Sequence, residues 1–314
     1  MFELHFLGTS AAAPSVYRGL TAQLLIVNEY RFLIDCGEGT QRQILQSGLG
    51  FKRLNRILLT HSHLDHILGL GGLVSTLTRW ENLDRIDIWG GKSTLYRVNS
   101  LLFNVVMLGQ RPPIPIELHT IEPGLILDDK NFTVTAFPVK HQGVENYGYL
   151  FQEKSRRPFL NDKAEMLGVP FGPERAKLVA GERITLKDGR VVTPDEVLGE
   201  TIPGVKYVHV GDCGFTGNLL EVAENADCLV IEATYLNEER ELARQFGHLT
   251  ATDGAQLAKE AGVKTLILTH ISRRSRESDI LNEAQAIFPN TFVARDFDHF
   301  LIHRDKPVEK VKRQ

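Results

Sequence analysis

The chain has 314 residues, 42% of them hydrophobic, and only three scattered cysteines, which exclude a disulfide framework and fit a reducing compartment. With 36 basic and 39 acidic residues the formal net charge is −3, which excludes a uniformly cationic protein that coats nucleic acid. The N-terminal segment has no basic leader and the apolar runs fall far short of the roughly 20 residues that span a bilayer, so we expect a soluble, cytoplasmic protein without a membrane partner.

The first 80 residues alternate strand-like runs, turns and helical patterns. Apolar or alternating residues predict four strands, over 2–7, 23–27, 31–34 and 56–60. A helix is expected after the third strand, with Thr40 as its N-cap and with Ile44 and Leu45 on its buried face. Apolar residues at helical spacing from Ile67 to Trp80 predict a further helix. The rhythm indicates a mixed α/β fold.

The second half of the chain repeats the pattern of the first. V-H-V-G-D-C-G at 208–214 parallels F-L-I-D-C-G at 32–37, and T-L-I-L-T-H at 265–270 parallels R-I-L-L-T-H at 56–61. Each copy is a strand that ends in Asp or His and is followed by a turn and a helix. Two matches in the same order predict a duplicated unit that forms two facing halves, with ordinary strand-end turns as the alternative.

Residues 154–190 fit neither half. The segment has nine basic and five acidic residues, a local charge of +4, and prolines and glycines interrupt it. Its apolar residues are too sparse to build a core of their own, so we expect an extended arm. The alternative is an insertion without a role, because charged runs are usually solvated surface.

Four metal-ligating side chains lie within six residues, directly after the strand at 56–60. They are His61, His63, Asp65 and His66. At this spacing the imidazoles at i and i+2 can converge on one ion, while the Asp and the following His point to a second position beside it. Imidazole with carboxylate is a ligand set for zinc, manganese or iron.

Further ligands are expected at other strand ends. His141 follows a strand over 132–140, Asp212 ends one over 207–211, and His270 ends one over 266–269. Together with the first cluster they supply enough nitrogen and oxygen donors for two adjacent ions, which a carboxylate such as Asp212 could bridge.

The motif H-S-H-L-D-H at 61–66 matches the His-x-His-x-Asp-His signature of the metallo-β-lactamase superfamily, whose fold is a duplicated αββα sandwich. Further stretches resemble one branch, ribonuclease Z, the endonuclease that trims the 3′ trailer from precursor tRNA. They are F-L-G-T-S at 6–10, D-C-G-E-G-T-Q at 35–41, K-H-Q-G-V-E-N-Y-G-Y at 140–149, E-A-T at 232–234, G-H-L-T at 247–250 and G-V-P-F-G-P at 168–173. The last matches the Gly-Pro hairpin of that family's tRNA-clamping exosite.

The resemblance covers nearly the whole chain and implies one domain over 1–314, with an inserted arm over 155–205 as the exosite. It implies two Zn2+ ions per chain, with Mn2+ as the alternative. One ion would be held by His61, His63, His141 and Asp212, and the other by Asp65, His66, His270 and the same Asp212. Such a pair of ions lowers the pKa of a water and stabilises the entering and leaving oxygens of a phosphodiester.

The resemblance also implies roles outside the ligand set. Asp65 would be the proton acceptor, and His248, oriented by Glu232, the proton donor or charge stabiliser near the leaving 3′ oxygen. The tRNA contacts carried over are Lys154, Arg156, Arg157, Lys163, Gly172, Pro173, Arg175, Lys177 and Arg18. The family's homodimer, in which one subunit's arm grips tRNA for the other's active site, makes a dimer the expectation.

The chain departs from the family's pattern in three places. Val16 and Gly19 stand where a loop linked with CCA discrimination often has Lys and Asn, Ile231 stands where His precedes the Glu-Ala-Thr motif, and Ser275 replaces a common aromatic residue. None of these removes a metal ligand. Two alternatives remain: a small-molecule phosphodiesterase or other hydrolase of the same superfamily, for which a long arm has no use, and a non-catalytic RNA-binding protein, against which the complete ligand set argues.

Some ligand-type residues receive no role from the sequence. Cys36 and Cys213 are expected to pack in the core rather than bind metal. Five histidines are left without a function: His5, His119, His209, His299 and His303.

Overall fold

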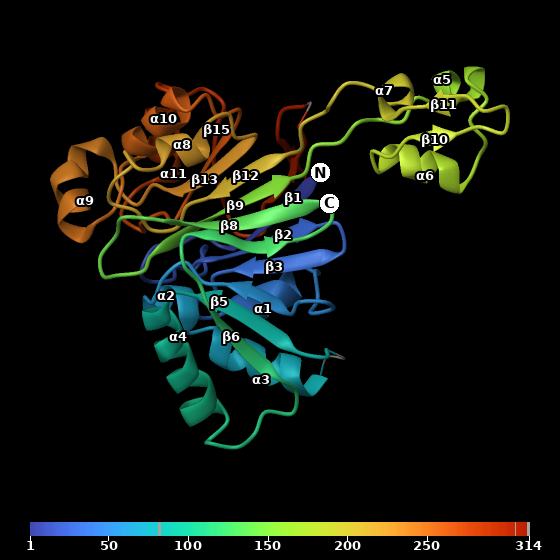
Figure 1. The fold of residues 1–314 in the computed structure, drawn as a ribbon. Coiled ribbons are helices and arrows are strands. Elements are labelled where there is room, and N and C mark those ends of the chain that lie inside the picture. The colour runs from blue at the N-terminus through green and yellow to red at the C-terminus, as the bar shows by residue number, and fades with distance from the viewer. Residues whose placement is uncertain (81–82, 305, 313–314) are drawn as a thin grey trace. The chain divides into compact units, whose positions relative to one another are not determined.

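The computed structural model describes residues 1–80, 83–304 and 306–312. The chain forms two compact units (Figure 1). Residues 1–152 with 205–314 make the larger unit, here called the body, and residues 153–204 make the smaller one, here called the inserted unit. Among the described residues, no helix combines the length and apolar character needed to cross a membrane.

Two sheets form the centre of the body. The first contains β1 (Phe2–Gly8), β2 (Ala22–Val27), β3 (Tyr30–Ile34), β4 (Arg56–Leu58), β5 (Ile86–Gly90), β6 (Ile116–Thr120), β16 (His299–Ile302) and β17 (Glu309–Val311), in the order β17-β16-β1-β2-β3-β4-β5-β6. The second contains β7 (Gly124–Asp128), β8 (Phe132–Pro138), β9 (Tyr147–Glu153), β12 (Lys206–His209), β13 (Cys228–Glu232), β14 (Leu266–Thr269) and β15 (Thr291–Val293), in the order β15-β14-β13-β12-β9-β8-β7.

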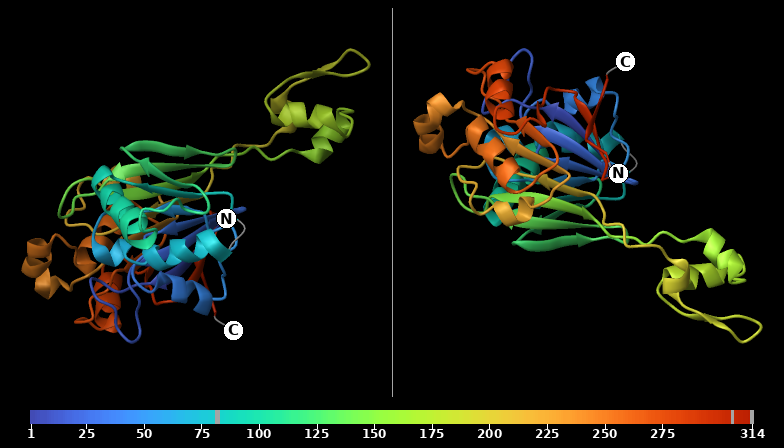
Figure 2. Two further views of the ribbon diagram at one scale, coloured as in Figure 1. Left: turned by 90° about the horizontal axis from the view of Figure 1, so that it is seen from below. Right: turned by 90° about the horizontal axis from the view of Figure 1, so that it is seen from above.

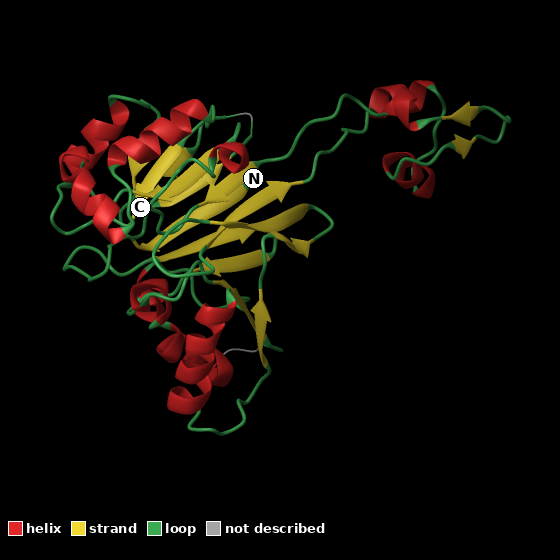
Figure 3. Ribbon diagram, turned by 60° about the vertical axis from the view of Figure 1, so that its left-hand side comes forward, coloured by secondary structure: helices red, strands yellow, loops and turns green. Residues whose placement is uncertain are grey.

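Helices cover the outer faces of both sheets (Figures 2 and 3). The helices of the first half are α1 (Thr40–Gln46), α2 (Leu64–Ile67), α3 (Leu70–Trp80), α4 (Lys92–Asn99) and the π-helix η1 (Ser100–Val106). Those of the second half are α8 (Leu220–Ala223), the 3₁₀ turn η2 (Asn237–Glu239), α9 (Arg240–Phe246), α10 (Ala251–Glu260) and α11 (Glu277–Gln285).

The main core lies between the two sheets. Phe32 on β3 packs edge-on against Phe132 on β8 and Phe151 on β9, with ring centroids 5.9 and 5.2 Å apart. Separate apolar clusters lie between each sheet and its helices. This is the predicted αββα sandwich, because alternate residues of each strand face the partner sheet and the others face helices.

Each half contributes a run of parallel strands. In the first sheet β3, β4, β5 and β6 are parallel neighbours, and in the second β12, β13, β14 and β15 are. The repeated sequence patterns lie on these runs, one in each sheet, as the duplication predicts. The polar residues that follow the strands therefore gather at the strands' carboxyl ends.

The N-terminal helices differ in detail from the prediction. Gly39, with φ at 86°, is the N-cap of α1, while Thr40 is its first residue and donates its hydroxyl proton to the Gly37 carbonyl. Ile44 is buried but Leu45 is 59% exposed, because so short a helix presents only a narrow stripe to the core. The helix predicted over 67–80 is broken between α2 and α3 at Gly69, where a Cβ atom would overlap the Gly37 carbonyl.

The inserted unit has a small core, so the expectation that it could not build one was wrong. It consists of α5 (Asn161–Met166), α6 (Pro173–Val179), β10 (Ile184–Thr185), β11 (Val191–Val192) and α7 (Pro194–Val197). Seven apolar side chains are buried together: Ala164, Val169, Leu178, Ile184, Val192, Val197 and Leu198. They lie far apart in sequence, and short elements that fold back on one another bring them together.

The local charge of +4 applies to residues 154–190 but not to the inserted unit as a whole. Residues 153–204 contain nine basic and nine acidic residues, because Glu153, Asp195, Glu196 and Glu200 lie outside the 154–190 window. The inserted unit is therefore electroneutral, and any contact with phosphates depends on where its basic side chains lie.

Candidate metal centre and active site

All seven predicted ligands come together at one edge of the body. Four follow β4, and the others follow β8, β12 and β14. The ligand atoms of His61, His63, His141 and Asp212 all lie within 4.8 Å of one another, and so do those of Asp65, His66 and His270. The fold thus assembles the two ligand groups that the sequence motifs predicted.

The carboxylate of Asp212 lies between the two groups. Its Oδ2 atom is 3.6 Å from Nε2 of His61 and 3.8 Å from Nε2 of His141. Its Oδ1 atom is 3.4 Å from Nε2 of His66 and 3.3 Å from Nε2 of His270. One oxygen of the carboxylate therefore faces each group, which is the geometry of a bridging ligand.

The remaining ligands complete each group. His63 Nδ1 lies 3.3 Å from His141 Nε2. Asp65 Oδ2 lies 3.5 Å from His270 Nε2 and 3.7 Å from His66 Nε2. The backbone N–H of Ala12 donates to the same Asp65 oxygen at 3.0 Å, which restricts its orientation.

Buried atoms of the cluster fit a pair of transition-metal ions. Nε2 of His61, Nε2 of His66 and Oδ1 of Asp212 are buried without a hydrogen-bond partner among the described residues. A buried polar atom without a partner costs free energy, and here several of them face one another. Imidazole nitrogens with carboxylate oxygens are the ligands of zinc and manganese, so the residues present fit these ions.

Hydrogen bonds fix the ring nitrogens that face away from the cluster. His66 Nδ1 donates to Asp35 Oδ2 at 2.8 Å, and His141 Nδ1 donates to the Gly247 carbonyl at 2.6 Å. His270 Nδ1 donates to the hydroxyl oxygen of Thr234 at 2.9 Å. With these nitrogens protonated, the Nε2 lone pairs point into the cluster, as metal ligation requires.

Asp35 contacts the cluster in a way that the sequence analysis did not identify. Its buried carboxylate accepts hydrogen bonds from the backbone N–H and the hydroxyl of Thr60, in addition to that from His66. The residue has a φ of 58°, a left-handed conformation that is uncommon for residues other than glycine. The signal available was its place at the end of a buried strand, parallel to that of Asp212 in the repeat.

Glu232 and His248 lie next to the cluster as predicted. The fully buried Glu232 accepts from His248 Nδ1 at 2.8 Å and from the backbone N–H of Cys213 at 2.6 Å. The His248 ring centroid is 4.9 Å from that of His141 and 5.4 Å from that of His270. Burial lowers the pKa of His248, but the charge and hydrogen bond of Glu232 outweigh it and raise the pKa to about 9.

Most of the ligands have pKa shifts that favour the form that binds metal. For His66, by contrast, burial is outweighed by the charges of Asp212 and Asp35, which raise the pKa well above normal. Burial raises the pKa of Asp65, but the hydrogen bond from His270 and the charge of His66 bring the net pKa below its usual value. Burial likewise opposes the ionisation of Asp212, and the surrounding histidines lower its pKa well below normal. Burial lowers the pKa of His61 and His141, which favours the neutral imidazole.

Both cysteines beside these aspartates are buried, as expected. Burial raises the pKa of Cys213 to about 12, and it raises that of Cys36 further. Both therefore stay protonated, and neither belongs to a group of ligand atoms among the described residues.

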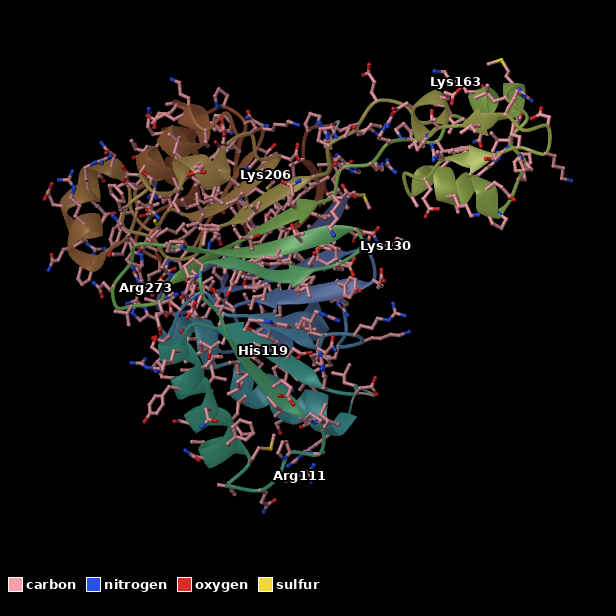
Figure 4. All side chains as sticks on the ribbon, viewed as in Figure 1. Arg111, His119, Lys130, Lys163, Lys206 and Arg273 are labelled. Carbon is pink, nitrogen blue, oxygen red and sulfur yellow. The ribbon has the colours of Figure 1, made fainter. Side chains whose placement is uncertain are left out.

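Most of the predicted RNA contacts are exposed on the inserted unit. Figure 4 labels Lys163 there, on α5. The other exposed members are Lys154, Arg156, Gly172, Pro173 and Lys177. These side chains and the Gly-Pro turn lie on the surface of the inserted unit.

Among the predicted RNA contacts, the arginines Arg157, Arg175 and Arg18 are already bound to protein groups. Arg157 pairs with Asp195 at 2.6 Å, and the Arg175 guanidinium lies 3.5 Å from the centre of the Phe171 ring. In the body, Arg18 donates to the Thr9 hydroxyl and the Ala294 carbonyl and pairs with Glu277 at 2.8 Å. These arginines stabilise the folds of their own units, and an RNA contact for each of them stays a prediction.

The sandwich and its cluster of histidines and aspartates define a member of the metal-dependent β-lactamase superfamily. Two family models match the chain: "Beta-lactamase superfamily domain" over residues 175–271 and "Anti-Pycsar protein Apyc1" over residues 2–155. The chain is also 46% identical to a ribonuclease Z of Bradyrhizobium diazoefficiens, over 96% of this chain and all of that one. It is 40% identical to a ribonuclease Z of Archaeoglobus fulgidus, over 95% and 96% of the two chains. The chain belongs to the ribonuclease Z family.

Solved structures agree with this assignment. The crystal structure of the short form of human tRNase Z, ELAC1, aligns with a TM-score of 0.68 at 25% identity and covers 96% of this chain and all of that one. The metallo-β-lactamase fold protein YhfI of Bacillus subtilis also aligns with a TM-score of 0.68, over 95% and 98% of the chains. At 18% identity, the second match shows the fold alone.

Proposed function

We propose that this protein is an endoribonuclease that removes the 3′ trailer from precursor tRNA by hydrolysis and leaves a 3′-hydroxyl on the tRNA. The observation that carries the proposal is the position of Asp212, whose two oxygens face two separate groups of ligand atoms. Relatives over nearly the full length are named ribonuclease Z, which supports RNA as the substrate.

The proposed cofactor is a pair of Zn2+ ions, with Mn2+ as the alternative. His61, His63, His141 and Asp212 would hold one ion, and Asp65, His66, His270 and Asp212 the other. When bound, the ions supply Lewis acidity, which lowers the pKa of the attacking water and neutralises charge on the phosphodiester. Elemental analysis should find at least two ions per chain, and a protein that takes up no transition metal would contradict the assignment.

Two protein groups move the protons of the reaction. Asp65 accepts the proton of the attacking water, because its carboxylate is ionised and the N–H of Ala12 holds it in place. His248 faces the cluster as a cation, and Glu232 holds it from the other side. We assign it the role of donor to, or charge stabiliser of, the leaving 3′ oxygen of the tRNA.

We propose that the inserted unit binds tRNA through its exposed residues Lys154, Arg156, Lys163, Gly172, Pro173 and Lys177. The exposed ring of Phe171, next to the Gly-Pro turn, adds a surface on which a base can stack. The family resemblance supports a homodimer in which this unit serves the partner's active site. Three buried, unpaired cysteines support a location in the cytoplasm.

The test is direct. Purified, zinc-loaded protein is incubated with precursor tRNA and, separately, with a small chromogenic phosphodiester, with the Asp65→Ala protein as the inactive control. We expect a single cut at the start of the trailer and a 3′-hydroxyl on the tRNA. Hydrolysis of the small ester alone would indicate a small-molecule phosphodiesterase, and binding of tRNA without cleavage would indicate an RNA-binding protein.

A further inference from the structure

Two of the histidines without a role in the sequence analysis meet on strands from opposite ends of the chain. His5 on β1 and His299 on β16 are direct partners in the antiparallel register. Glu3 lies two residues before His5, so both side chains leave the same face of β1. Figure 2 shows the red C-terminal strands beside the blue N-terminal strand. The three residues offer ligand atoms within 4.8 Å of one another.

The distances within this group are close to those of a metal site. The two imidazole rings stack with centroids 4.0 Å apart and an interplanar angle of 19°. Glu3 Oε2 is 3.6 Å from His299 Nε2 and 3.9 Å from His5 Nε2. Ligands of a tetrahedral zinc ion lie about 3.3–3.6 Å apart, given bond lengths of about 2.0–2.2 Å. These distances are close to the observed ones, but stacked rings direct their in-plane lone pairs parallel to each other. Closing the site therefore also requires one imidazole to turn about its Cβ–Cγ bond.

The chemical state of both imidazoles favours metal binding. Nε2 of His5 and Nε2 of His299 are buried and have no hydrogen-bond partner among the described residues. Burial, with contributions from His299 and Arg31, lowers the pKa of His5 to about 4, and burial also lowers the pKa of His299. Both rings are therefore neutral near neutral pH, and the Nε2 atom of each has no hydrogen bond to any residue that the structure describes.

Charge and access are also compatible with an ion. Arg31 opposes a cation here, but its guanidinium is bound to the carbonyls of Leu49, Gly50 and Lys52, and Glu3 supplies the offsetting negative charge. His5 and His299 line a cavity of about 600 Å³, which gives a path to solvent and room for a further ligand. None of the three residues belongs to the centre around Asp212.

We infer that Glu3, His5 and His299 form an additional binding site for a divalent transition-metal ion, with Zn2+ the best fit to two imidazoles and one carboxylate. The bound ion joins the first strand of the body to a strand near the other end of the chain. Because the ion binds the folded form, it stabilises that form. The free energy of unfolding rises with the logarithm of the zinc concentration once this concentration exceeds the dissociation constant.

Metal counting tests the inference. The full chain is stripped with a chelator, reloaded with Zn2+, desalted and analysed for zinc per chain, together with the variants His5→Gln and His299→Gln. His303→Gln is the matched control, because His303 lies just beyond β16 and outside the group. We expect each of the first two variants to hold one zinc ion fewer than the wild type, and the control to hold the same number.

A second measurement uses the unaltered chain and does not depend on the folding of a variant. Crystals soaked in Zn2+ should give an anomalous peak at the zinc edge between His5 and His299, apart from any peak near Asp212. Equal zinc content in all four proteins, or no peak at this position, would overturn the inference.

Discussion

Removal of the inserted unit should separate RNA binding from hydrolysis. Arg156 and Ile202 form an antiparallel bridge in which the N–H of each donates to the carbonyl of the other, at 2.9 and 2.8 Å. Replacing residues 157–201 by Asn-Gly closes this bridge as a two-residue hairpin. The seven core residues of the unit all lie within the deleted segment, so the three apolar clusters of the body stay complete. The shortened protein should therefore fold.

The expected loss of affinity does not come from net charge. The deleted segment has seven basic and eight acidic residues, so its removal changes the formal charge from −3 to −2, which slightly favours RNA. Five exposed basic residues are lost, of which Arg190 already pairs with Asp188, which leaves Lys163, Lys177, Arg183 and Lys187 for phosphates. If each contacts one phosphate, the slope of log affinity against log salt concentration falls by about 3. Affinity for precursor tRNA should fall by about two orders of magnitude or more near physiological salt.

The assay measures tRNA binding at several salt concentrations, cleavage of precursor tRNA and hydrolysis of a chromogenic phosphodiester. Hydrolysis of the small ester should survive, because the metal ligands, Asp65 and His248 all lie outside the deletion. Processing of precursor tRNA at the normal rate would refute the reasoning and make the unit an inert insertion. Loss of both activities in a folded protein would show that the unit helps to shape the metal centre.

Three substitutions test the proposed site. Asp65→Ala should lower the rate of cleavage by about 10²–10⁴-fold and leave tRNA binding nearly unchanged, because binding depends on phosphate contacts elsewhere. An equal loss of cleavage and of binding would contradict a purely catalytic role for Asp65. Asp35→Asn should weaken zinc affinity by about 10–100-fold in a chelator competition, since it alters the hydrogen bond to His66, and unchanged affinity would refute that role. Glu232→Gln should lower kcat by about 10²-fold with little change in KM for tRNA, whereas a change confined to KM would show that His248 serves binding rather than chemistry.

The metal ligands could be predicted from the sequence because their signals are local. The spacing of His61, His63 and Asp65 after a short apolar strand is readable in one window, and His141 and His270 stand at the ends of other readable strands. What the spacing could not provide is the way in which Asp212 turns one oxygen to each group. That geometry depends on the packing of two sheets, which no local pattern encodes.

Other features were out of reach for different physical reasons. The core of the inserted unit comes from elements of two to seven residues, which are too short to show a periodic pattern. His5 and His299 are 294 residues apart, and only the register of β1 with β16 makes them neighbours. The contact of Asp35 with His66 is made across α1 and β4, so the residue type of Asp35 alone did not distinguish it from a structural Asp.

The duplication explains why the site needs both halves of the chain. Asp35 and His270 follow strands in opposite halves, and both have a left-handed backbone, with φ at 58° and 56°. Such conformations cost of order 1–3 kcal/mol for residues other than glycine, and here the hydrogen bonds from His66 to Asp35 and from His270 to Thr234 hold them in place. Neither ligand group is complete within one half, since Asp212 joins the first group from the second half and His270 joins the second. Metal binding at this centre therefore depends on how the packing of the two sheets positions the ligands, so substitutions that alter this packing should change the metal affinity without touching a ligand.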